Sequence, residues 1–234
     1  MGCDPALIEQ PGVTVKGSPD RAENHVTAGY TVGEHFFIPC DPAVEAMLTD
    51  AVAAASMEPT LDGFNALAAV QGGELLGVGR MQLHTGDALP DVALAEGYTM
   101  RSLDYRDEAD VALIARLVEI SDEDDLDEAE IELDNLDDLI EVVLDPAGEI
   151  ASFGSSRDFD MSPGFGDIGI MTRPDCRGFG LGSAAVVAVS HRIRAQGDEP
   201  LYRCDEDNAG SIALSRGLGF SIATKLSAFR FATN

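Results

Sequence analysis

One stretch decides the fold of this chain: residues 166–196, which read GDIGIMTRPDCRGFGLGSAAVVAVSHRIRAQ. Its first part, residues 167–172, is a short and mostly apolar run of strand length, which Pro174 ends. Three glycines follow at alternate positions: Gly178, Gly180 and Gly182. Residues 183–196 then carry apolar side chains at helical spacing. The stretch therefore predicts a strand, a glycine-rich turn and a helix.

A glycine-rich turn in front of a helix is suited to binding phosphate. The first turn of a helix has unpaired backbone N–H groups and a partial positive charge, and glycine has no Cβ to keep an anion away from them. We call this turn the cradle and expect it to hold a diphosphate. Its residues are Arg177, Gly178, Phe179, Gly180, Leu181, Gly182 and Ser183.

Two common phosphate-binding motifs do not fit the cradle. A P-loop needs a lysine after its last glycine, and no lysine occurs between Lys16 and Lys225. A dinucleotide fingerprint needs a third glycine where Ser183 stands, and more βαβ units than the chain can supply after Gly182. Both classes are therefore excluded.

The pattern R-x-x-G-x-G does fit residues 177–182, and residues 208–220 follow it with the sequence NAGSIALSRGLGF. Together these motifs resemble the coenzyme A-binding core of the GNAT superfamily of N-acetyltransferases, over roughly the C-terminal 135 residues. The resemblance implies an α/β (α+β) fold with a mixed central sheet and flanking helices. It also implies acetyl-CoA as co-substrate and no metal. The alternative is a turn that merely joins a strand to a helix.

The resemblance also implies how the coenzyme arm is held. Two parallel strands splay apart in this family, and the pantetheine arm bonds along the freed strand edge. Here that edge would be the backbone of Ile170, Met171 and Thr172, with further polar contacts from Asn208 and Ser211.

Two residues are candidates for proton transfer, both by resemblance. Asp167 stands where many members carry a glutamate that takes the amine proton through water, although a strand-end carboxylate that bonds a nearby turn is the structural alternative. Ser215 stands where many members carry a tyrosine that serves the leaving thiolate. A serine hydroxyl is shorter and has no useful acidity near neutral pH, so here the chain departs from the family pattern.

Composition narrows the functional classes. The chain has 15 basic and 42 acidic residues, a formal charge of −27, which disfavours nucleic acid as a partner. The acidity has two explanations, and both stay open. The acidic residues either form a solvated surface or give the active site a negatively charged entrance that attracts cationic amines.

No apolar run reaches about 18 residues, so we expect no membrane span and a cytoplasmic protein. The four scattered cysteines show neither zinc-site nor disulfide spacing: Cys3, Cys40, Cys176 and Cys204.

Three segments are expected along the chain: an arm at 1–25, an α+β lobe at 26–95 and the GNAT-like domain at 96–234. Hairpin patterns at 66–83 and 139–154 suggest that the first lobe is a truncated GNAT-like unit without a coenzyme site. An unrelated α+β cap is the alternative. Asp41 is expected to cap a helix that runs to about Ser56.

The most acidic segment, Ser121–Asp138, is expected to border the acceptor channel, and we call it the acidic flap. Four apolar residues are its expected anchors: Leu126, Ile131, Leu133 and Leu136. The flap either attracts an ammonium group or is a solvated face.

The sequence thus predicts an acetyl-CoA-dependent N-acyltransferase for a small, cationic amine, with a homodimer as the default assembly. The alternative is a non-catalytic acyl-CoA-binding or regulatory module that has lost its acid and base. In layout alone, the two lobes are similar to tandem acyltransferases of thiol-cofactor synthesis.

Overall fold

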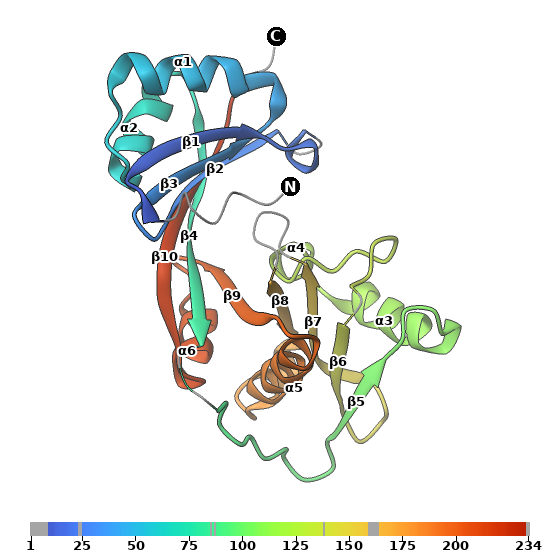
Figure 1. Ribbon diagram of the computed structural model, residues 1–234. Helices are drawn as coiled ribbons and strands as arrows, with labels where there is room; N and C mark the ends of the chain where they lie inside the picture. The colour runs from blue at the N-terminus through green and yellow to red at the C-terminus, as the bar shows by residue number, and fades with distance from the viewer. Residues whose placement is uncertain are drawn as a thin grey trace.

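The computed structural model describes residues 9–22, 25–84, 86, 88–137, 139–158 and 164–232 (Figure 1). Its centre is one ten-stranded mixed sheet with the strand order β1-β3-β2-β10-β4-β9-β8-β7-β6-β5. The strands are β1 (Gly12–Gly17), β2 (Val26–Val32), β3 (His35–Cys40), β4 (Glu74–His84), β5 (Thr99–Leu103), β6 (Leu139–Leu144), β7 (Ile150–Asp158), β8 (Phe165–Thr172), β9 (Glu199–Asp205) and β10 (Phe220–Arg230). The helices are α1 (Glu45–Ala55), α2 (Leu61–Val70), α3 (Glu108–Ile120), α4 (Glu123–Glu128), α5 (Leu181–Gln196) and α6 (Ala209–Gly217). The predicted mixed sheet with flanking helices is confirmed.

The C-terminal lobe, from β5 to β9 with α3 to α6, has helices on both faces of its sheet. On one face, Leu113 and Leu117 of α3 pack with Phe153 of β7 in a buried cluster. On the other face, Val189 and Ile193 of α5 pack against Ile168 of β8. The predicted order of strand, glycine-rich turn and helix is therefore present as β8, the cradle and α5.

The N-terminal lobe places α1 and α2 against β1, β2 and β3 (Figure 1). Asp41 accepts a hydrogen bond from the backbone N–H of Ala43 at 2.9 Å, with Pro42 next to it. This confirms the predicted cap, although a 3₁₀ turn precedes α1. Phe64 of α2 meets Phe229 of β10 edge to face, at 5.3 Å between ring centroids. A strand from the end of the chain thus completes the first lobe.

Strands β4 and β10 join the two lobes into one sheet, and Figure 1 shows them running from one lobe to the other. β4 lies between β9 and β10, pairing antiparallel with both. β10 also pairs with β2, from Leu226↔Tyr30 to Arg230↔Val26. β4 precedes the expected boundary between residues 95 and 96 but pairs with β9 of the C-terminal lobe. β10 follows that boundary but pairs with β2 of the N-terminal lobe.

The structure bears on several further sequence-based expectations about these elements. The hairpin expected at 66–83 is wrong, because residues 61–70 form α2: Thr60 caps it through Gly63 N–H at 3.1 Å, and its apolar residues recur at helical spacing. The hairpin at 139–154 is present as β6 and β7. Part of the expected arm is β1, which pairs parallel with β3. Residues 1–8, with Cys3, lie outside the described part of the chain.

Without the first hairpin, the sequence argument for an internal duplication is lost. Leu133, expected to anchor the acidic flap, is also 42% exposed, whereas Ile131 is buried. Among the described residues, every helix is too short or too polar to cross a membrane.

Candidate functional site

The site is built around a fork between β8 and β9. The two strands pair in parallel from Phe165↔Glu199 to Ile168↔Tyr202, and no further rung joins them in the described part of either strand. β8 continues to Thr172 along β7, and β9 continues to Asp205 along β4. The strands therefore diverge after Ile168, and the edge of β8 beyond it faces an opening. This is the edge that the sequence predicted.

The cradle lies at the mouth of the fork. Gly178 and Gly180 have positive φ values of 86° and 76°, which L side chains rarely adopt. No side chain caps α5, and its first helical hydrogen bond runs from Ala184 N–H to Gly180 O. The N–H groups of the first turn therefore have no partner within the helix. A Cβ built at Gly178 or Gly180 meets nothing within 4 Å, so the space in front of these groups is open.

A pocket of about 390 Å³ connects the cradle to the fork, and we call it the first pocket. Every predicted coenzyme-binding residue except Phe179 lines it: Ile170, Met171, Thr172, Arg177, Gly178, Gly180, Leu181, Gly182, Ser183, Asn208 and Ser211. Phe179 instead points outward, 56% exposed, and its ring stacks with that of Tyr98. The structure thus gathers residues from three separate sequence segments into one cavity.

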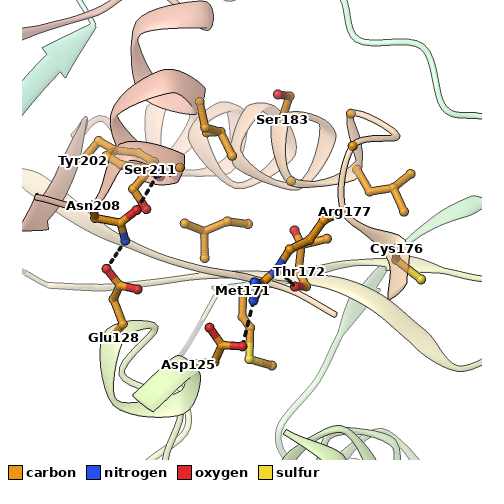
Figure 2. A pocket seen from close by; sticks show the side chains of 17 residues that line it. Asp125, Glu128, Met171, Thr172, Cys176, Arg177, Ser183, Tyr202, Asn208 and Ser211 are labelled. Atoms are coloured by element: carbon orange, nitrogen blue, oxygen red, sulfur yellow. Dashed lines mark hydrogen bonds and ion pairs between the residues drawn. The ribbon is translucent and has the colours of Figure 1, made fainter. Parts of the chain in front are cut away.

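Helix α4 of the acidic flap closes one side of the first pocket, as Figure 2 shows. Asp125 accepts a hydrogen bond from Arg177 Nη2 at 2.7 Å, while Arg177 Nε donates to Thr172 O at 3.0 Å. Glu128 accepts a hydrogen bond from Asn208 Nδ2. Two carboxylates of the flap therefore bond two of the polar side chains that the sequence assigned to the coenzyme, Arg177 and Asn208.

A second pocket of about 250 Å³ shares Ile170, Glu128 and Ser211 with the first. Asp167 lines it and is 5% exposed. Its Oδ2 accepts from Arg203 Nε at 2.8 Å, and its Oδ1 has no hydrogen-bond partner among the described residues. Burial raises the pKa of Asp167, and the charge of Arg203 opposes that rise. The second pocket thus contains a buried carboxylate with one free oxygen.

Glu130 supports this arrangement from the flap. Its Oε1 accepts from Arg203 Nη2 at 2.9 Å, and its φ of 53° is unusual for a residue with a side chain. Uncommon backbone conformations of this kind gather at functional sites. Glu130 and Arg203 were both missed by sequence reasoning, because no local motif marks them.

Ser215 does not reach either pocket. It is fully buried, and its hydroxyl donates to Gln82 Oε1 at 3.0 Å and to Ile212 O at 3.2 Å. The bond to Gln82 ties α6 to β4. The side chain expected near the leaving thiolate therefore serves packing between the strand and the helix.

Tyr202 of β9 was also missed by sequence reasoning. It belongs to the last rung of the fork and lines the first pocket. No local motif marks its place in the pocket, because the direction of its side chain depends on the pairing of β9 with β8.

Gly169 fixes the position of the acidic flap on β8. A Cβ at this position would lie 2.5 Å from Ala129 O, a backbone atom. We expect Gly169→Ala to lower the free energy of unfolding in urea by about 1–3 kcal/mol, because the flap must shift to admit the methyl group. Gly217→Ala is the control, since a Cβ there meets nothing within 4 Å. Equal stability of the two variants would contradict the close contact.

Comparison with known proteins places this geometry in context. The family model described as FR47-like protein matches residues 161–228, which include most of the fork, the cradle and α6. Relatives from Pseudomonas paraeruginosa and Pseudomonas aeruginosa are both described as L-methionine sulfoximine/L-methionine sulfone acetyltransferase, and each is 40% identical over 89 residues. The match covers 36% of this chain and 52% of each relative. The chain thus spans about half the length of these relatives.

Solved structures share the fold at low sequence identity. A GCN5-related N-acetyltransferase from Sphaerobacter thermophilus has a TM-score of 0.54 at 19% identity, covering 72% of this chain and 55% of its own. A tandem GNAT protein from the clavulanic acid biosynthesis pathway has 0.53 at 18%, covering 71% and 57%. A GCN5-related N-acetyltransferase from Kribbella flavida has 0.52 at 15%, covering 81% and 76%. These likenesses show the fold.

Proposed function

We propose that the protein transfers an acetyl group from acetyl-CoA to the amine of a small cationic acceptor. The premise is that the C-terminal lobe of this chain belongs to the GNAT superfamily. One observation carries the proposal: two pockets meet at the fork of β8 and β9, with open helix N–H groups at the far end of one and a buried carboxylate in the other.

The first pocket suits the acyl donor. The free N–H groups at the start of α5 are matched to a diphosphate, and the positive end of the helix favours its charge. The freed edge of β8 offers backbone groups to an extended chain with amide bonds, as a further strand would. Ile170, Met171 and Thr172 supply these groups. The coenzyme, when bound, provides an activated thioester.

The second pocket suits a cationic acceptor. Five carboxylate residues line it against two arginines: Asp127, Glu128, Glu130, Asp167 and Asp205 against Arg80 and Arg203. This excess of negative charge favours an ammonium group over an anion. The carboxylates of the acidic flap in this pocket support its role in attracting an ammonium group. The acidic residues outside the pocket fit a solvated surface equally well.

The residues of the fork can carry the transfer between these pockets. The amine nitrogen attacks the thioester carbon, the carbon–sulfur bond breaks, and its electron pair goes to sulfur. Asp167 Oδ1 takes the proton of the attacking nitrogen through water, since Arg203 holds only Oδ2. A backbone N–H near Met171 polarises the thioester carbonyl. The products are an N-acetyl amide and the thiol of coenzyme A.

A non-catalytic acyl-CoA-binding module is the second candidate. The position of Ser215 favours it, because a hydroxyl bonded to Gln82 inside the core cannot serve a leaving group. In that case the first pocket binds the coenzyme and the second binds a regulatory amine.

Thiol release from acetyl-CoA tests the proposal against this alternative. We would measure it with polyamines, aminoglycosides, peptide N-termini, L-methionine sulfone and L-methionine sulfoximine as acceptors, and measure coenzyme binding by calorimetry. Release with any of these amines supports the enzyme. Tight binding without release supports the module, and failure to bind acetyl-CoA contradicts both.

The flap carboxylate Asp125 gives a further prediction for donor binding. It lines the first pocket and bonds Arg177, so it competes with a diphosphate for that guanidinium. We expect Asp125→Asn to tighten acetyl-CoA binding about threefold to tenfold at low salt, and less at high salt. Asp124→Asn removes the same charge from an exposed position of the same helix. An equal gain in both variants would mean that net charge, and not the Arg177 contact, limits binding.

A further inference from the structure

Arg80 of β4 lines the second pocket, and its guanidinium is only weakly paired. Among the described residues it has one ion pair, from Nη2 to Glu206 Oε1 at 3.5 Å, and its Nε has no hydrogen-bond partner. Arg203 in the same pocket differs, because it donates to Asp167 at 2.8 Å and to Glu130 at 2.9 Å. Charge-assisted hydrogen bonds are typically about 2.7–2.9 Å long. Arg80 therefore retains donors for a further anion.

The sheet places a second cation beside Arg80. Lys225 of β10 is its direct cross-strand partner. Like charges directly opposite each other on neighbouring strands destabilise a sheet. In the described part of the chain one carboxylate, that of Glu206, pairs with both, since it also accepts a hydrogen bond from Lys225 Nζ. Two cations thus share one anion, and this part of the sheet has a surplus positive charge.

The register of the sheet brings Arg80 close to the fork. Arg80 pairs with Cys204 of β9, two residues beyond Tyr202 in the last rung that joins β9 to β8. Cys204 also lines the second pocket. β9 alone lies between β4 and the opening, and neighbouring strands are about 4.8 Å apart. Arg80 is therefore one strand away from the edge where the fork opens.

The charges of the second pocket are divided between two sides. The acidic flap supplies three carboxylate residues on the side of β8: Asp127, Glu128 and Glu130. Arg80 supplies positive charge from β4 on the other side. Asp205 lies nearby, but side chains alternate along a strand, so it is on the opposite face of the sheet from Cys204 and Arg80. A pocket with a negative and a positive side suits a molecule that carries both charges.

We propose that Arg80 binds a carboxylate of the acceptor, so that the acceptor is an amine that also carries a carboxylate, as an amino acid does. The inference rests on the proposed function, because it takes the second pocket as the acceptor site. The ammonium group faces the carboxylates of the flap, and the planar guanidinium binds both oxygens of the acceptor carboxylate through parallel N–H donors.

This role gives the N-terminal part of the chain a share in the acceptor site. Arg80 precedes the C-terminal lobe and lies outside residues 161–228, which match the family model. It reaches the second pocket only because β4 pairs with β9. The carboxylate specificity would therefore be a property of this chain's own two-lobed arrangement.

The test compares acceptors that differ at the carboxylate. Thiol release from acetyl-CoA would be measured with L-lysine against cadaverine, and with L-methionine sulfone against its carboxamide. We expect Arg80→Gln to raise KM for the carboxylate-bearing member of each pair about tenfold to a hundredfold, because a charge-assisted pair is lost. KM for the other member and for acetyl-CoA should not change. Arg80→Lys keeps the charge without the planar fork and should restore part of the affinity.

Glu206→Gln should have the opposite effect. It removes the carboxylate that competes for Arg80 and Lys225, so KM for the carboxylate-bearing acceptors should fall about threefold to tenfold, while cadaverine should not bind more tightly. A purely structural role of Arg80 predicts no such opposition between the two variants. Glu45→Gln is the matched control, because Glu45 of α1 also pairs with a lysine, Lys16, and it should leave every acceptor constant unchanged.

Calorimetric titration of the same four compounds into protein saturated with coenzyme A gives a readout without turnover. Wild-type protein that binds or acetylates the carboxylate-bearing compounds no better than their partners would overturn the role of Arg80. An equal change for both members of a pair in Arg80→Gln would overturn it as well, and so would the absence of binding by all four. Each of these results leaves the proposed function intact as long as another amine releases thiol from acetyl-CoA.

Discussion

Gly180→Val should abolish measurable binding of acetyl-CoA, with a loss of at least about a hundredfold. Gly180 is the residue before α5, with φ of 76°, and the space where its Cβ would stand is open. A valine there would fill the space in front of the first N–H groups of the helix. Each charge-assisted hydrogen bond lost contributes about 1.5–3 kcal/mol, so two suffice for the expected loss.

The control for this variant is at the other end of the same helix. Gly197 follows α5, has φ of 96°, and its Cβ position is equally open. Gly197→Val therefore introduces a β-branched residue at a positive φ with a comparable strain, about 24 Å from Gly180 along a helix of 16 residues. Its melting temperature should fall as much as that of Gly180→Val, but its calorimetric affinity for acetyl-CoA should be unchanged. Retained binding by Gly180→Val would refute the cradle.

Arg177→Ala provides a milder contrast in the same titration. The Arg177 side chain is 54% exposed and already shared between Asp125 and Thr172 O. Exposed ion pairs contribute little, so we expect a loss of less than about tenfold. The difference between the two variants separates the contribution of the main chain from that of the side chain.

The cradle could be predicted from the sequence because its residues are neighbours along the chain. Arg177 to Ser183 is one continuous turn, and glycine at 178 and 180 is required by the backbone conformation itself. The hairpin error at 66–83 has a local cause as well. A short apolar run such as Ala66 to Val70 fits either a strand or a helix, and the cap at Thr60 decides for the helix.

The remaining parts depend on contacts between distant segments. The place of β4 between β9 and β10 decides that Gln82 meets Ser215, and no spacing within either segment reveals this. Arg203 meets Asp167 only because their strands pair in parallel. Such partners follow from the register of the sheet, which the sequence specifies only through the whole fold.

Asp167→Asn should lower kcat by about a hundredfold to a thousandfold, with little change in the KM for acetyl-CoA. Removal of a general base costs rate in this range, and Asp167 lines the second pocket and not the first. The side chain of asparagine keeps the shape of aspartate and leaves Glu130 as a partner for Arg203. Asp110→Asn is the control, because Asp110 is also buried and paired with an arginine, Arg101, but lies on α3.

The pH dependence of kcat distinguishes a base from a residue that only supports the fold. Asp167 can accept a proton only when it is ionised, and burial raises its pKa above the ordinary value of an aspartate. The wild-type rate should therefore fall as the pH decreases through this raised pKa, and the fall should begin at a higher pH than for a solvated carboxylate. In Asp167→Asn the residual rate should lack this acidic limb, while Asp110→Asn should retain it. An acidic limb that persists unchanged in Asp167→Asn would assign the proton transfer to another carboxylate of the second pocket, of which Glu130, joined to the same Arg203, is the nearest by contact.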